Sequence, residues 1–374
     1  MNSKHRRKNS RDSRYELLRI VAMFCVVLCH VIAYNGWALE QRPGWAGTLS
    51  LAVDQYIGQF GVAVFYMLSG FFLSTRSFRS DHLIKTMIQT FSYSVLALAI
   101  GLVWGIRYTA KDIYMALFPI SNNVYWFITA YVIMLAFSPI LNMMFIQFAR
   151  RRLLTWIALL LSFSVLPYIS FIGFKYNGLQ WTTVVYAICC YLIGGYVRRY
   201  GHFLWANHVM MKIIIVAVTG FIALVVFLRA AQEEWGLARF FEWKPRSVYG
   251  SLPIFSISVA AGVMTLISQQ SIGNDTRRTQ SSGFSSVINV VASSTMGIYL
   301  IHQHPIVAGK LWDMVSQIQY PGNPVSGILV IMAESMAIFA LLAVVSICVN
   351  AFVQPMSMAL ISKIKRIVFR RPSE

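Results

Sequence analysis

The sequence predicts an all-α integral membrane protein with about ten transmembrane helices and both termini in the cytoplasm. Three observations indicate this class. Hydrophobic residues make up 57% of the 374-residue chain and charged residues only 12%, a composition typical of membrane proteins rather than of soluble domains. Apolar runs of spanning length recur along the chain. The formal net charge of +19 is concentrated in alternate connections between those runs, as the positive-inside rule describes.

The apolar runs divide the chain into one multi-span domain and two tails. A helix needs about 20 predominantly apolar residues to cross a bilayer, and ten runs meet that requirement. They form a domain over residues 15–352, between basic cytoplasmic tails at 1–14 and 353–374. The predicted spans are about 15–34, 53–73, 85–105, 124–146, 153–172, 179–197, 211–229, 250–269, 285–303 and 325–350.

The distribution of basic residues supports this topology. With the first tail in the cytoplasm, 22 of the 32 Lys and Arg residues fall on the cytoplasmic side and nine on the outer side, while Arg19 lies within the first span. The basic tails also favour contact with anionic membrane lipids. Residues 230–249 mix charges of both signs with aromatic residues, and we expect them to lie along the outer interface.

Two classes of partner are not expected. Topology accounts for the positive charge, so the sequence predicts no nucleic-acid partner. The five cysteines all lie in apolar runs without the spacing of metal ligands, so no metal is expected.

The first span carries two ionisable side chains, Arg19 and His30. They are eleven residues apart in the sequence, which at 100° per residue is three turns plus about 20°. Both therefore point to the same side of the helix, about 16 Å apart along its axis. Ionisable groups inside a span are costly and usually face the bundle interior or a wet cavity. The alternative is an interfacial arginine with one packed, neutral histidine.

A second candidate site lies at the cytoplasmic end of the second span. Ser69 and Gly70 remove side-chain bulk there, which either lets two helices approach closely or leaves space for a ligand. Arg76 and Arg79 follow, on the side from which a soluble anionic cofactor would arrive. Arginines are also ordinary in cytoplasmic loops, so the pattern leaves both interpretations open.

Aromatic residues and a histidine gather at the predicted outer face. Tyr125, Trp126 and Tyr131 open the fourth span, where they form either an aromatic belt or a platform for sugar rings. His302 ends the ninth span, and His304 follows two residues later. Two residues so spaced lie on different sides of a helix, so these histidines are not a chelating pair.

Glu334 lies near mid-depth of the tenth predicted span. A lone carboxylate is expensive at that depth. We therefore expect Glu334 to pair with Arg19, to pair with His30, or to be protonated.

These residues together resemble the signature of the acyltransferase-3 family of membrane-bound acyltransferases. The first span has an arginine, ten intervening residues and a histidine, and the predicted span count agrees. Members usually place a basic residue soon after a Ser-Gly-Phe stretch, whereas here the first is Arg76, five residues after Phe71. The other stretches similar to recurring pieces of the family are 65–71, which ends in Ser69-Gly70-Phe71, Tyr125-Trp126-Phe127 and Tyr299-Leu300-Ile301-His302.

The resemblance implies transfer of an acyl group from cytoplasmic acyl-CoA to a sugar hydroxyl. The acyl group is most simply acetyl, from acetyl-CoA. The acceptor would be a cell-surface or secreted polysaccharide, or its lipid-linked precursor, at the plasma membrane. Arg19 is expected to hold the CoA phosphates and His30 to act as the base, by direct transfer or through an acyl-histidine. The predicted donor-binding residues are Arg19, Ser69, Gly70 and Arg76, and the predicted acceptor-binding residues are Tyr125, Trp126, Tyr131 and His302.

Two other functions fit parts of the pattern. A transporter or flippase of lipid-linked sugars would use Arg19, His30 and Glu334 as a proton relay or anion site, although no internal repeat is visible. A non-catalytic membrane partner of a polysaccharide synthase would need none of these groups. Turnover of acyl-CoA by the purified protein separates the enzyme from both.

Overall fold

The structure, a computed structural model, describes residues 12–37, 45–165, 179–201, 207–233, 253–273 and 283–368. Within these ranges all regular secondary structure is helical, and no strand occurs among them. The predicted all-α class is therefore confirmed for the described part of the chain.

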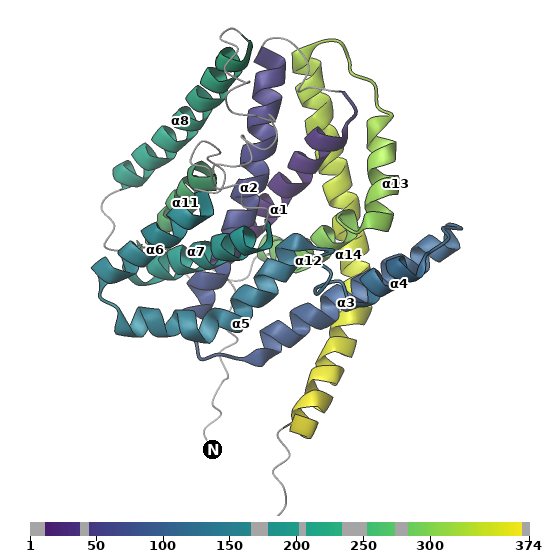
Figure 1. The fold of residues 1–374 in the computed structure, drawn as a ribbon, viewed down its shortest axis with the longest axis horizontal. Helices are drawn as coiled ribbons and strands as arrows, with labels where there is room; N and C mark the ends of the chain where they lie inside the picture. Colours follow the sequence, from purple (N-terminus) through teal and green to yellow (C-terminus); the bar gives the residue numbers. More distant parts are fainter. Residues whose placement is uncertain are drawn as a thin grey trace, which may run out of the picture.

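Each of the ten predicted spans overlaps a helix, and two short helices, α4 and α13, lie in connections between predicted spans. The helices in chain order (Figure 1) are α1 (Ser13–Tyr34), α2 (Trp45–Leu73), α3 (Ser80–Val103), α4 (Ala110–Leu117), α5 (Trp126–Gln147), α6 (Arg150–Val165), α7 (Leu179–Tyr200), α8 (Asn207–Glu233), α11 (Pro253–Gly273), α12 (Gly283–His302), α13 (Pro305–Ser316) and α14 (Pro324–Val368).

The chain is a multi-pass membrane protein, whereas ten crossings and cytoplasmic termini stay predictions. Most of the predicted interfacial segment at 230–249 lies outside the described residues, as do the ends of both basic tails. Five described helical stretches are long and apolar enough to cross a membrane by length and composition: Ser13–Tyr34, Tyr56–Leu73, Ser80–Val103, Trp126–Gln147 and Pro324–Lys363.

Helices α1 and α2 lie side by side in the middle of the bundle, and the end of α14 projects from it (Figure 1). Gly61 permits the close approach of α1 and α2, because a Cβ atom there would collide with the backbone carbonyl of Ala22. Nearer the start of α1, the ring centroid of Tyr15 lies 4.8 Å from that of Phe71. These contacts fix α1, which carries Arg19 and His30, against α2.

A reciprocal glycine contact joins α2 to α7. A Cβ atom at Gly70 would collide with the carbonyl oxygen of Tyr191, and one at Gly194 would collide with the carbonyl oxygen of Met67. Small residues allow helix backbones in membranes to approach this closely. The two helices therefore meet backbone to backbone at the level of Ser69 and Gly70.

Polar side chains tie α14 to α3 and to α12. The Tyr93 hydroxyl and Gln89 Nε2 each donate to Asn350 Oδ1, both at 3.1 Å. Ser346 of α14 donates to the backbone carbonyl of Ser294 in α12 at 2.8 Å. Interhelical hydrogen bonds of this kind are worth about 0.6–2 kcal/mol each in membranes, and they help to fix α12, which carries His302.

Candidate active site

His30 lines a cavity of about 150 Å³ between α1, α2, α5 and α12, which we call the His30 cavity. Met23, Val26 and His30 all line it from α1, as residues spaced by three and four positions on one helix face do. The remaining wall residues are Cys29, Gly58, Gln59, Val62, Phe65, Trp126, Phe127 and Tyr299.

The His30 ring is enclosed by aromatic side chains. Its centroid lies 5.1 Å from that of His302, 6.1 Å from that of Trp312 and 6.3 Å from that of Tyr34. One hydrogen bond reaches the ring from a neighbouring helix end: Gln303 Nε2 lies 3.0 Å from His30 Nε2. The structure therefore brings His30 and His302 into contact, although they lie at opposite ends of the sequence.

Two buried polar atoms around His30 lack a hydrogen-bond partner among the described residues. They are Nε2 of His302 and the hydroxyl of Tyr299, and on His30 itself Nδ1 also has none among these residues. The other ring nitrogen of His302, Nδ1, donates to the carbonyl of Ile298 at 2.6 Å. Because buried polar groups are nearly always hydrogen-bonded, these two atoms indicate where a polar ligand or a water molecule would bind.

Arg19 lies about one helical turn from Met23, on the face of α1 that lines the His30 cavity. Its guanidinium forms an ion pair with Glu16 at 2.6 Å. The Glu16 side chain is only 8% exposed, against 25% for Arg19, so the carboxylate is buried and the guanidinium is partly accessible. Arg19 is not among the residues that line the His30 cavity, and its predicted contact with CoA phosphates stays a prediction.

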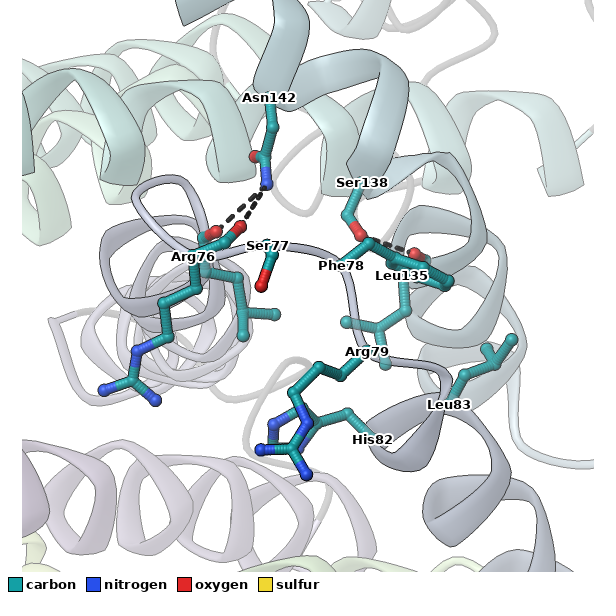
Figure 2. A pocket seen from close by; sticks show the side chains of 10 residues that line it. Arg76, Ser77, Phe78, Arg79, His82, Leu83, Leu135, Ser138 and Asn142 are labelled. Carbon is teal, nitrogen blue, oxygen red and sulfur yellow. Dashed lines mark hydrogen bonds between the residues drawn. The ribbon is translucent and has the colours of Figure 1, made fainter. Parts of the chain in front are cut away.

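A second cavity, of about 300 Å³, lies at the loop between α2 and α3. We call it the basic cavity, because Arg76, Arg79 and His82 all line it. Figure 2 shows these three side chains pointing to the same side of the loop, away from α5. Arg79 pairs with Asp81 at 2.9 Å, whereas no carboxylate of a described residue lies within 4.0 Å of Arg76. Arg76 is therefore available to an anionic ligand.

Helix α5 forms the opposite wall of the basic cavity. Asn142 Nδ2 donates to the carbonyl of Leu73 at 3.0 Å and also approaches that of Arg76, as Figure 2 shows. One turn earlier, Pro139 has no N–H to donate to the carbonyl of Leu135. The hydroxyl of Ser138 donates to that carbonyl instead, at 2.7 Å.

The two cavities lie along the same pair of helices. On α2, Phe65 lines the His30 cavity and Leu73 lines the basic cavity. On α5, Phe127 lines the His30 cavity and Leu135 lines the basic cavity. Each pair is eight residues apart, which is about 12 Å along a helix.

Ser69 and Tyr131 lie between the two cavities. The Ser69 hydroxyl hydrogen-bonds the hydroxyl of Tyr131 at 3.2 Å, which joins α2 to α5 midway. Ser69 thus faces α5. Gly70, next to it, faces α7 in the close backbone contact described above. The donor-binding role predicted for both residues stays a prediction.

The three aromatic residues predicted to bind the acceptor occupy different environments. Trp126 lines the His30 cavity. Tyr131 lies deeper, at Ser69. Tyr125 is 1% exposed, and its ring packs against those of Tyr299 and His304, at centroid distances of 6.2 and 6.0 Å. Of the three, Trp126 is the one placed to touch a ligand in the His30 cavity.

His304 caps α13, the helix that follows His302. Its Nδ1 accepts a hydrogen bond from the N–H of Ile306 at 3.3 Å. Burial lowers the pKa of His304 to about 4, because a low-dielectric environment disfavours the charged form. The ring is therefore neutral at pH 7, as accepting a hydrogen bond at Nδ1 requires.

Glu334 in α14 has no hydrogen-bond partner on either carboxyl oxygen among the described residues. Arg19 pairs with Glu16 instead, and the hydrogen bond to His30 comes from Gln303. Glu334 therefore pairs with neither Arg19 nor His30 in the described part of the chain, and its protonation stays a prediction.

The structure brings to these sites three residues that the sequence pattern did not indicate. Gln303 and Trp312 contact His30 from the turn after α12 and from α13. Arg198 of α7 places its guanidinium 5.0 Å from the ring centroid of Phe71, so a cation does lie beside the Ser-Gly-Phe stretch, supplied by another helix. A basic pair, Arg198 and Arg199, was visible in the sequence, but its neighbours in space were not.

The fold and the site define a multi-pass helical membrane protein with a buried histidine cavity and a basic cavity between the same two helices. Comparison with protein-family models then identifies the family, because the acyltransferase domain of the acyltransferase-3 family matches residues 12–352. The chain belongs to this family. Membership confirms the resemblance seen in the sequence and supports acyltransferase activity. Comparisons with curated proteins and with solved structures find no match.

Proposed function

We propose that this protein transfers an acyl group, most simply acetyl, from cytoplasmic acyl-CoA to a sugar hydroxyl. The acceptor is a cell-surface or secreted polysaccharide, or its lipid-linked precursor, and the plasma membrane is the site of the reaction. The observation that carries this proposal is the placement of the basic cavity and the His30 cavity along the same pair of helices, α2 and α5. That placement suits a donor with a charged end and a reactive end.

The basic cavity suits the phosphates of CoA. No carboxylate of a described residue pairs with Arg76, and Arg79 and His82 add donors beside it. Arginine forms charge-assisted, often bidentate hydrogen bonds with phosphate. The loop between α2 and α3 lies on the predicted cytoplasmic side, where acyl-CoA is found. Arg19, with a partly accessible guanidinium on the His30 face of α1, is the second proposed phosphate contact.

The pantetheine arm would lie between α2 and α5. The two cavities are separated by about 12 Å along each helix, a distance that an extended pantetheine chain covers. Ser69 and Tyr131 meet midway at 3.2 Å and offer hydroxyl groups to the amides of the arm. This path brings the thioester from the basic cavity to His30.

At the His30 cavity, the acceptor hydroxyl would give its proton to the imidazole while its oxygen attacks the thioester carbon. The carbon–sulfur bond then breaks, and the sulfur of CoA takes up the proton as a thiol. A positioned base of this kind is typically worth about 10²–10⁴ in rate. Trp126 offers an aromatic face to the sugar ring. His302 lies against His30, and its Nε2, which has no partner among the described residues, is available to a second hydroxyl.

The test uses purified protein in lipid nanodiscs with acetyl-CoA, with and without a glycan acceptor. We expect release of free CoA that depends on the acceptor, and acetyl groups on the sugar in equal amount. Absence of turnover with every acyl-CoA tried would exclude the enzyme. Movement of a lipid-linked sugar across proteoliposomes without thioester cleavage would establish a flippase in its place.

A further inference from the structure

Gln303 is the side chain that hydrogen-bonds His30, and the proposed function leaves it without a role. Its Nε2 lies 3.0 Å from Nε2 of His30. An amide nitrogen can only donate a hydrogen bond, so Nε2 of His30 accepts it. The single proton of the neutral imidazole is then on Nδ1.

The backbone around Gln303 holds the amide in place. Helix α12 ends at His302, and α13 begins at Pro305, which has no N–H and cannot continue the preceding helix. The N–H of Gln303 donates to the carbonyl of Tyr299 at 3.1 Å, and His304 caps α13 from the other side. Gln303 therefore lies on a short turn that is fixed at both ends.

His302 provides a comparison within the same site. Its Nδ1 lies 2.6 Å from the carbonyl of Ile298. A carbonyl can only accept, so this nitrogen carries the proton and Nε2 does not. The backbone determines the tautomer of His302, whereas a side chain that can be substituted determines the tautomer of His30.

We propose that Gln303 is a positioning residue that keeps His30 in the tautomer with an unprotonated Nε2, the form in which Nε2 can act as the general base. In the reaction, the acceptor hydroxyl would take the place of the Gln303 amide as the hydrogen-bond donor to Nε2 of His30. The kinetic consequence rests on the proposed function. The tautomer itself can be measured without any activity.

Two substitutions separate the hydrogen bond from the shape of the side chain. Gln303→Met keeps the length but cannot donate, and Gln303→Glu places an acceptor opposite Nε2 and so draws a proton onto it. Gln317→Glu, at an exposed position after α13, is the matched control. The readout is the ¹⁵N shift of each ring nitrogen of His30 in the purified, full-length protein labelled with ¹⁵N-histidine, assigned by its absence in His30→Gln.

In the unsubstituted protein and in Gln317→Glu, we expect His30 with its proton on Nδ1. Gln303→Met should give a mixture of tautomers, and Gln303→Glu should show a protonated Nε2. With acyl-CoA and acceptor, kcat should fall about 2- to 12-fold in Gln303→Met, as for the loss of one neutral hydrogen bond. It should fall about 100-fold or more in Gln303→Glu, as for the loss of a base. The KM for acyl-CoA should not change in either.

Identical His30 shifts in all variants, or a proton on Nε2 in the unsubstituted protein, would overturn the role of Gln303. The expected shifts without turnover in any protein, the unsubstituted one included, would support the tautomer assignment and overturn the acyltransferase proposal. The two proposals can therefore fail separately.

Discussion

The basic cavity and the His30 cavity share α2 and α5 but differ in volume, charge and exposure. The basic cavity is about 300 Å³ and is lined by exposed arginines at a loop. The His30 cavity is about 150 Å³ and is lined mainly by aliphatic and aromatic side chains. His30 and Gln59 are polar residues in its wall. The first environment suits binding of a charged group, and the second is the less polar of the two. The proposed function therefore assigns donor binding and chemistry to separate cavities along one pair of helices.

The sharpest test of this separation is His30→Gln. Loss of the proposed base should lower kcat by about 100-fold or more. Equilibrium binding of acyl-CoA should not change, because the proposed phosphate contacts, Arg76 and Arg19, do not line the His30 cavity. CoA release and calorimetric binding measure the two quantities, and His208→Gln, at an exposed position on α8, is the control. Turnover near that of the unsubstituted protein would remove His30 from the chemistry. Loss of donor binding as well would mean that the two cavities form one site.

Arg76→Ala tests the other half of the comparison. Loss of a charge-assisted hydrogen bond costs about 1.5–3 kcal/mol, so the KM for acyl-CoA should rise about ten- to a hundredfold while kcat stays the same. Arg76→Lys should give an intermediate KM, because lysine keeps the charge but not the bidentate geometry. Arg151→Ala, at an exposed position on α6, should change neither value. A fall in kcat at constant KM would contradict the assignment of the phosphates to this cavity.

Gly70→Ala distinguishes a packing role from a donor-binding role. The added methyl group would collide with the carbonyl of Tyr191, and overpacking of this kind costs about 1–3 kcal/mol. We therefore expect a lower thermal unfolding midpoint with an unchanged KM for acyl-CoA. Gly309→Ala, where a Cβ atom would meet no atom within 4 Å, is the matched control. Unchanged stability with a raised KM would assign Gly70 to the donor site.

Trp126→Ala should have the smallest effect. Removing one aromatic face costs about 0.5–1.5 kcal/mol beyond the buried area, so the KM for the glycan acceptor should rise about 2- to 12-fold. Equilibrium binding of acyl-CoA should not change, because the proposed donor path lies between α2 and α5. Trp156→Ala, at an exposed position on α6, controls for loss of an indole. An effect on the donor KM alone would place the acceptor elsewhere.

Features that follow from helix periodicity could be predicted from the sequence. The eleven-residue spacing of Arg19 and His30 predicts one shared face of α1. Met23 and Val26, which lie between them on that face, line the His30 cavity together with His30. Every predicted span likewise overlaps a helix, because long apolar runs have few alternatives in a membrane.

Helix periodicity does not predict the direction of side chains that lie outside helices. It also does not predict which helix packs against a given residue. Tyr125 and Trp126 are adjacent, but Tyr125 has φ −120° and ψ 83°, so helical phase does not give the direction of its side chain. Gln303 lies in a turn between two helices, where no periodicity applies. Gly70 suited both a ligand space and a packing contact, and the packing contact involves α7, a neighbour that the sequence does not reveal.

Pro139 leaves one turn of α5 without its backbone hydrogen bond, so the helix is less stiff there than elsewhere. The backbone hydrogen bond that would brace its turn is replaced by one from the Ser138 hydroxyl to Leu135, and a hydroxyl rotates about a single bond whereas a peptide N–H does not. Beyond that turn, Asn142 ties α5 to the loop that carries Arg76. On the other side, α2 is locked to α7 by Gly70 and Gly194. The basic cavity therefore lies between α2, which is held against α7, and the part of α5 that begins at the turn weakened by Pro139.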